Sequence, residues 1–140
     1  MNVKLTKAQK IKIANSEDLF SIMKQVLKRE NKLGRQKEHF WVVGLDVHSV
    51  IAYIELVALG SISQIVIKPV EVFSFAVTKK CESIILVHNH PSGDLNPSQS
   101  DIDLTYKLLN GGKILEIKVL DHLIISTKDY ISFIDKKLLA

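Results

Sequence analysis

The feature that most constrains this chain is the short apolar run SIILV at residues 83–87, which leads directly into the polar stretch HNHPSGDLNPSQSD at residues 88–101. The run contains two isoleucines and a valine, and polar residues bound it, as is typical of a central strand. A strand that ends in a polar loop presents the side chains of that loop at one edge of the sheet. We therefore expect residues 83–87 to form a buried strand that positions His88 and His90.

Helical patterns lie on both sides of this strand. Asn15 and Ser16, followed by two acids, predict the start of a first helix whose apolar residues continue to Leu27. Pro69 suits the first turn of a second helix, because the N–H that proline lacks is not needed there. That helix is predicted to bury Val70, Phe73, Ala76 and Val77. A third helix is predicted from Ile102 to Asn110, ended by Gly111 and Gly112.

Further strands are predicted at residues 39–46, 50–59, 62–67 and 114–126, the last being one bent strand or two. Helices interspersed with a mixed sheet predict a layered α/β domain. We place an N-terminal basic extension at residues 1–14 and the domain itself at residues 15–140.

Composition limits the function classes. The chain has 140 residues, of which 46% are hydrophobic and 24% charged, so it can bury a core and is not disordered. It contains no apolar run of membrane-spanning length and no signal peptide, which predicts a soluble, cytoplasmic protein without membrane contact. The single cysteine, Cys81, excludes an internal disulfide and any multi-cysteine zinc site.

The positive charge is concentrated near the N-terminus. Residues 1–37 carry ten basic and three acidic residues, a net charge of +7, whereas the whole chain has a net charge of +4. This excess is compatible with an arm that contacts nucleic acid or an acidic partner. The other interpretation is a solvated helix face, which the scarcity of aromatic residues among these lysines favours, since residues 1–37 contain one, Phe20.

The polar stretch predicts a metal site. His88 and His90 are two residues apart at the end of a strand, so their side chains face the same side. Asp101 begins the inward stripe of the following helix, whereas Asp103 is about 200° away and faces water. Two histidines and one carboxylate leave the fourth tetrahedral position open to water, as in a catalytic zinc site. The alternative for Ser98 and Asp101 is a helix capping box.

The same residues resemble a known family. The pattern H-x-H-P followed by S-x-x-D, here His88, His90, Pro91, Ser98 and Asp101, is similar to the motif of the JAMM (JAB/MPN) metalloproteases. Its surroundings, EHFWVVGLD, KPVEVF, HNHPSGD, PSQSD and VLDHLII, resemble the RadC family of bacterial DNA-repair-like proteins. The resemblance covers roughly residues 15–135. The chain is too short for the N-terminal helix-hairpin-helix module of longer members, so it is similar to the short, stand-alone ones.

This resemblance implies a three-layer α/β/α fold with a mixed sheet, of the JAB/MPN (cytidine-deaminase-like) type. It implies Zn²⁺ held by His88, His90 and Asp101, and hydrolysis of a peptide or isopeptide bond. A deaminase is not expected, because His90 stands where that class has glutamate and the chain has one cysteine.

Further roles are expected, for Glu38 and Ser98 from the same resemblance and for Glu71, Asp121 and His122 from their places in the sequence. Glu38, just ahead of the first strand, matches the JAMM general base, and Glu71 in the second helix is its rival. Ser98 matches the serine that donates a hydrogen bond to the developing oxyanion. Asp121 or His122 is either a partner that orients a ligand histidine or a buried polar pair.

Two other functions remain open. The first is a DNA-associated module, related to repair or to mobile elements and with nuclease activity as one form. The second is a non-catalytic scaffold with a structural metal. For partners, we expect a protein or peptide substrate, with nucleic acid as the weaker alternative, and an edge strand could pair into a homodimer.

Overall fold

The computed structural model describes residues 2–139. Its centre is a five-stranded mixed sheet with the strand order β2-β1-β3-β4-β5. The strands are β1 (His39–Leu45), β2 (Ile51–Leu59), β3 (Ser83–Asn89), β4 (Lys118–Ile125) and β5 (Tyr130–Ser132). β3 is central, antiparallel to β1 and parallel to β4. The predicted buried strand at residues 83–87 is confirmed, and it extends two residues further to include His88.

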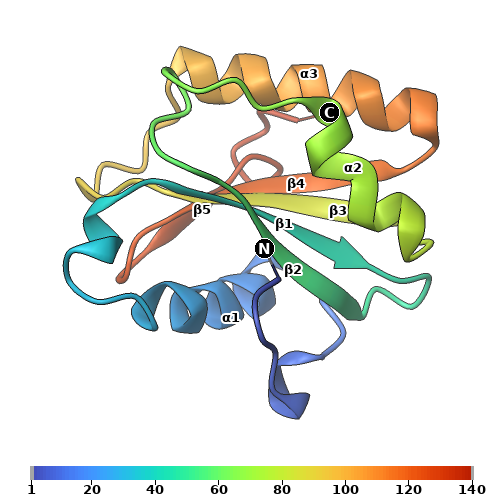
Figure 1. Ribbon diagram of the computed structural model, residues 1–140, viewed down its shortest axis with the longest axis horizontal. Helices are drawn as coiled ribbons and strands as arrows, with labels where there is room; N and C mark the ends of the chain where they lie inside the picture. Colours follow the sequence, from blue (N-terminus) through green and yellow to red (C-terminus); the bar gives the residue numbers. More distant parts are fainter. Residues whose placement is uncertain (1, 140) are drawn as a thin grey trace.

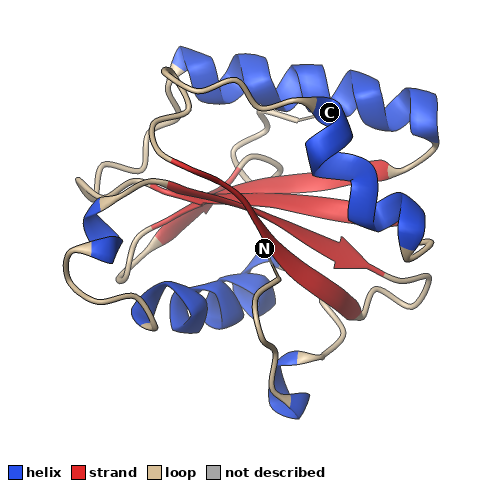
Figure 2. Ribbon diagram, viewed as in Figure 1, coloured by secondary structure: helices blue, strands red, loops and turns tan. Residues whose placement is uncertain are grey.

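Helices cover both faces of the sheet (Figure 1). The helix α1 (Ser16–Lys28) lies on one face, and α2 (Pro69–Thr78) and α3 (Gln99–Leu115) lie on the other. Short 3₁₀ turns, η1 (Lys7–Gln9) and η2 (Gly34–Gln36), flank α1 in the sequence. The colouring by secondary structure in Figure 2 makes these three layers plain. The predicted three-layer α/β/α fold is confirmed.

Alternate residues of the strands build two cores. Trp41, Val43 and Val87 pack with the apolar stripe of α1 on one face of the sheet. Phe40 and Leu86, from the opposite face, pack with α2 and α3. This alternation follows from the two-residue period of a strand. It also decides the position of His88, which shares the face of Leu86 and therefore points toward α3.

The start of α1 is confirmed, because the side chain of Asn15 caps it by accepting a hydrogen bond from the N–H of Asp18 at 2.9 Å. The predicted buried face of α2 was partly wrong. Val72 is buried together with Phe73 and Ala76, whereas Val70 and Val77 are exposed. The helix is therefore rotated relative to the prediction, so that Val72 contacts the sheet.

The predicted end of the third helix was wrong. Helix α3 runs through Gly111 and Gly112 to Leu115, and its C-cap, Glu116, takes the left-handed conformation with φ 59°. The glycines serve close packing instead. A Cβ on Gly112 would lie 2.4 Å from the carbonyl oxygen of Ile117, and one on Gly111 would lie 3.3 Å from the Phe73 ring. Small residues are needed where the end of α3 packs against Phe73 of α2 and against the main chain at Ile117.

Two strand predictions need correction. Residues 62–67 form no strand. Ile62, Ile65 and Ile67 instead pack against the core that lies between the sheet and the helices α2 and α3. Of the predicted strand at residues 114–126, the first two residues belong to α3 and the strand β4 begins at Lys118. Among residues 2–139, none of the helices combines the length and apolar character needed to cross a membrane.

Candidate metal centre

Three side chains converge at the end of β3. The Nε2 atoms of His88 and His90 are 2.9 Å apart. Asp101 places Oδ1 3.2 Å from His88 Nε2 and Oδ2 3.1 Å from His90 Nε2. Ligand atoms held at about 2.0–2.1 Å from a tetrahedral zinc ion lie about 3.3 Å from one another. The triangle formed by these three residues therefore has nearly the size that one such ion requires, and the cluster could hold a metal ion.

The local fold explains this convergence. His88 is the sixth residue of β3, and His90 follows that strand directly. Asp101 lies in the first turn of α3, where Ser98 is the N-cap. Ser98 Oγ accepts from the Asp101 N–H at 3.0 Å, and Asp101 Oδ2 accepts from the Ser98 N–H at 2.8 Å. The predicted capping box is confirmed, and the same carboxylate also faces both histidines.

A relay of hydrogen bonds behind the cluster fixes the protonation of His88. The Thr105 hydroxyl donates to the carbonyl oxygen of Asp101 at 2.7 Å, so its oxygen must accept from Nδ1–H of His122, which is 2.6 Å away. Neutral His122 then has a bare Nε2, which lies 2.7 Å from His88 Nδ1. His88 must donate there, which leaves its own Nε2 lone pair directed at Asp101 and His90.

The tautomer of His90 is fixed in the same way. Its Nδ1 lies 2.7 Å from the carbonyl oxygen of Asp94, which can only accept a hydrogen bond. His90 therefore donates from Nδ1, and its Nε2 faces the Asp101 carboxylate. Three electron-pair donors thus meet at one point with no proton of their own to share. Such a group of atoms repels itself unless a proton or a cation lies among them.

The pKa values are consistent with this arrangement. Burial lowers the pKa of both His88 and His122, because the charged imidazolium would lose its hydration there. For His90, the adjacent Asp101 carboxylate, which favours a proton on Nε2, outweighs burial and raises the pKa. Burial acts to raise the pKa of Asp101, but the adjacent rings of His88 and His90 and the Ser98 N–H hold that pKa well below the ordinary value. The carboxylate is therefore ionised.

The cluster is largely buried. His88 is fully buried, Asp101 is 3% exposed, and His90 is 13% exposed. A pocket of about 370 Å³ adjoins His90 and Asp101. We call it the acidic pocket, because Glu38, Asp94 and Asp101 line it together with five serines: Ser61, Ser63, Ser92, Ser98 and Ser100. Water and small molecules can reach His90 and Asp101 through this pocket.

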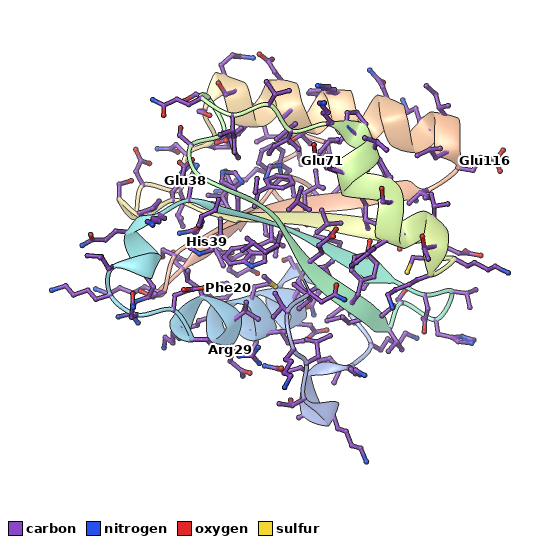
Figure 3. All side chains as sticks on the ribbon, viewed as in Figure 1. Phe20, Arg29, Glu38, His39, Glu71 and Glu116 are labelled. Atoms are coloured by element: carbon purple, nitrogen blue, oxygen red, sulfur yellow. The ribbon has the colours of Figure 1, made fainter. Side chains whose placement is uncertain are left out.

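Glu38 is the residue just before β1 and lines this pocket. Figure 3 labels Glu38 at the left of the sheet and Glu71 on α2. Its Oε2 accepts a hydrogen bond from the N–H of Ile62 at 3.1 Å. Its main-chain oxygen accepts from the N–H of Gly60 at 2.8 Å. Glu71, the rival base, is exposed on α2 and does not line the acidic pocket. Of the two glutamates, only Glu38 shares a pocket with His90 and Asp101.

Sequence reasoning missed two supports of this site. The first is Asn89, whose side chain bonds to the main chain on both sides of Glu38. The second is Thr105, which lies on the inward stripe of α3 and bonds to His122. A signal existed for Thr105, because it lies four residues after Asp101 on that stripe. His122, left open between two roles, contacts His88 directly.

Comparison with known proteins adds the family. A family model described as a RadC-like JAB domain matches residues 13–138. The chain belongs to this family. The matched part of this RadC-like domain includes the cluster of His88, His90 and Asp101.

The relatives of this RadC-like domain come from bacteria and archaea. A UPF0758 protein of Caldanaerobacter subterraneus is 40% identical over 131 residues, which is 94% of this chain and 54% of the relative. A UPF0758 protein of Methanosarcina mazei is 42% identical over 127 residues, which is 91% of this chain and 53% of the relative. A UPF0758 protein of Chlorobaculum tepidum is 38% identical over 129 residues, which is 92% of this chain and 56% of the relative. The chain thus spans about half the length of the curated relatives it matches.

Proposed function

We propose that this RadC-like domain is a zinc-dependent hydrolase of the JAMM type that cleaves an amide bond of a peptide or isopeptide. The observation that carries the proposal is the convergence of two imidazole lone pairs and one carboxylate on a point that opens into the acidic pocket. Nitrogen and carboxylate ligands suit zinc, and three protein ligands leave a position for water.

Zinc held by His88, His90 and Asp101 would supply Lewis-acid chemistry and lower the pKa of a coordinated water to about 7. The remaining roles belong to the chain itself. The relay from Thr105 through His122 keeps the Nε2 lone pair of His88 facing the site. The carbonyl oxygen of Asp94 does the same for His90. Ligands that are oriented in this way bind a metal more tightly than mobile ones.

Glu38 is the proposed general base. It accepts a proton from the attacking water while the water oxygen bonds to the carbonyl carbon of the substrate. It then delivers that proton to the leaving nitrogen as the carbon–nitrogen bond breaks, so the products are an acid and an amine. The Ser98 hydroxyl lies in the same pocket and would donate a hydrogen bond to the carbonyl oxygen as negative charge develops there.

The ligand assignment is tested by elemental analysis of zinc in the purified chain. We expect one zinc per chain in the wild type and strong loss in the His88→Ala, His90→Ala and Asp101→Ala variants. Asp103→Asn is the matched control, because Asp103 is exposed on the same turn of α3. Full zinc occupancy in the three ligand variants would contradict the assignment.

Catalysis is tested with the same proteins and a mixture of peptides and isopeptide-linked peptides, whose products are identified by mass spectrometry. Glu38→Gln should retain zinc and lose turnover by about 100-fold or more, since a positioned base contributes roughly 10²–10⁴. Glu71→Gln should retain both. If Glu71→Gln lost turnover and Glu38→Gln did not, the base would be Glu71. Zinc binding without any cleavage would instead favour the scaffold role.

A further inference from the structure

We propose that a second pocket, beside the acidic pocket, binds a carboxylate of the peptide substrate. We call it the basic pocket, because Lys32, Arg35 and Lys128 line it. The inference rests on the proposed function for the identity of the substrate as a peptide. Its charge and its position next to His90 do not depend on that function.

The basic pocket has a volume of about 360 Å³ and is built from three separate segments. Lys32 and Arg35 come from the stretch between α1 and β1 that includes η2, and Lys128 comes from the turn between β4 and β5. The loop after β3 forms the third wall. In Figure 1 these segments meet at the end of the sheet where β3 runs into its loop.

The two pockets share a wall. His90, Pro91 and Ser92 line both of them. A substrate whose amide bond lies in the acidic pocket near Glu38 can therefore extend past His90 into the basic pocket. Only the loop that contains these three residues separates the pockets, so a short extended segment of a peptide can reach from one to the other.

The charges of the basic pocket are available to a ligand. No acidic side chain is among the residues that line it. Among residues 2–139, the ion pairs involve only histidines and acids, and none uses Lys32, Arg35 or Lys128. Arg29, by contrast, is already occupied, because it donates to Lys4 and Gln9. Lys32 and Arg35, which bring part of the N-terminal positive charge to this pocket, therefore have no acidic partner among residues 2–139.

The basic pocket suits a carboxylate better than a nucleic acid. No phenylalanine, tyrosine or tryptophan lines it, so nucleotide bases lack the large rings on which they usually stack. The apolar part of its lining includes Leu27 and Pro91, which can contact the stem of a side chain. Arginine and lysine together with polar main-chain groups are the usual partners of a carboxylate. The carboxylate can belong to an acidic side chain or to a C-terminus.

The test is a fluorescence anisotropy titration of the full chain, loaded with zinc and carrying Glu38→Gln so that no probe is cleaved. Four labelled probes are compared: a peptide amide with two glutamates, its glutamine analogue, an alanine peptide with a free C-terminus, and a short single-stranded oligonucleotide. The combined variant Lys32→Gln, Arg35→Gln, Lys128→Gln removes the charges of the basic pocket. Its control, Lys113→Gln, Lys118→Gln, Lys136→Gln, removes equal charge from exposed positions outside both pockets.

We expect the glutamate peptide, the free C-terminus or both to bind about tenfold or more weakly to the pocket variant, because three weak charge interactions are removed together. The control should change binding by less than about twofold, and rising salt should weaken binding to the wild-type pocket. The probe that loses more affinity identifies the source of the carboxylate. Thermal unfolding of each variant checks that the fold is intact.

Equal binding of the acidic peptides to the pocket variant and the control would overturn the inference. So would tighter binding of the oligonucleotide that is lost in the pocket variant alone, because the site would then be one for phosphate. Failure of the hydrolase proposal is distinguishable, since the titration needs no turnover. Charge-dependent binding without cleavage in the wild type would leave the pocket standing and remove the reaction.

Discussion

The Asn89 side chain holds the main chain on both sides of Glu38. Its Oδ1 accepts from the N–H of His39 at 2.6 Å, and its Nδ2 donates to the carbonyl oxygen of Lys37 at 3.0 Å. Asn89 is the residue between the two histidines. The end of β3 and the residue that follows it therefore position both candidate metal-binding histidines and the proposed base.

Replacement of Asn89 by alanine should separate these two tasks. We expect Asn89→Ala to retain zinc, because His88 and His90 have their own hydrogen bonds. Turnover should fall by about tenfold to 100-fold, since small displacements of a catalytic group have effects of this size. Zinc analysis and a peptide-cleavage assay on the same sample provide the comparison, and unchanged turnover would mean that Glu38 is held by Ile62 and Gly60 alone.

The relay behind His88 predicts the effect of a change at Thr105, which is not itself one of the three proposed ligands. Thr105→Val keeps the shape of the side chain but removes the oxygen that accepts from His122. Zinc affinity, measured by competition with a chromophoric chelator, should fall by about 10–100-fold. The matched control is Thr78→Val, because Thr78 also bonds to the carbonyl four residues earlier, on the exposed side of α2. Equal affinities of both variants would rule out the relay.

Ser98 has two proposed tasks that different substitutions can separate. Ser98→Ala removes the helix cap and should lower the free energy of unfolding by about 0.5–2 kcal/mol, along with turnover. Ser98→Gly is a good N-cap residue but has no side-chain donor, so stability should largely return while turnover stays low. Chemical denaturation and a cleavage assay decide between the tasks. Recovery of turnover in Ser98→Gly would leave Ser98 with capping alone.

Tyr53 predicts a change of stability with pH. Its hydroxyl is buried and has no hydrogen-bond partner among residues 2–139. Burial, with smaller effects of Cys81 and Glu55, raises the pKa of this phenol above its ordinary value of 10.0. Because the folded state then holds its proton more tightly than the unfolded state, this contribution to stability is present below pH 10 and is lost as pH rises further.

Tyr53→Phe should therefore be as stable as the wild type or more stable at neutral pH, by up to about 1 kcal/mol. The advantage should grow above pH 10, where only the wild type has the phenol to ionise. Urea unfolding at the two pH values measures both effects. Tyr130→Phe is the contrasting control and should lose stability, since the Tyr130 hydroxyl pairs with Ser16 at 3.0 Å. A Tyr53→Phe protein that lost as much stability as Tyr130→Phe would contradict the assignment.

Much of the fold was predictable because the central strands are apolar throughout and bounded by polar residues. The prediction failed for residues 62–67. This segment has the composition of a strand, but it is a loop whose three isoleucines pack against the core shared with α2 and α3. The prediction also failed at Gly111 and Gly112, where the need for close packing with Phe73 and Ile117 outweighs the usual role of glycine as a helix stop. Both failures concern contacts with distant residues, which local patterns do not contain.

The candidate site was likewise predictable only where its residues are close in the sequence. His88, His90 and Asp101 lie within a short stretch of the sequence, so strand and helix periodicity predict that they meet. The link from Asn89 to the two neighbours of Glu38 instead depends on the register of β1 against β3, in which Phe40 pairs with His88. The contact between Thr105 and His122 likewise depends on how α3 lies over β4. Neither register nor helix placement can be read from spacing alone.

The Asp101 carboxylate closes the first turn of α3 and faces both histidines at once. Its dual attachment makes the helix terminus a reporter of occupancy, so that amide hydrogen exchange near Ser98 should slow when a cation enters and quicken when a chelator withdraws it. Amide exchange at the start of α3 can thus report whether a cation is bound, without any substrate.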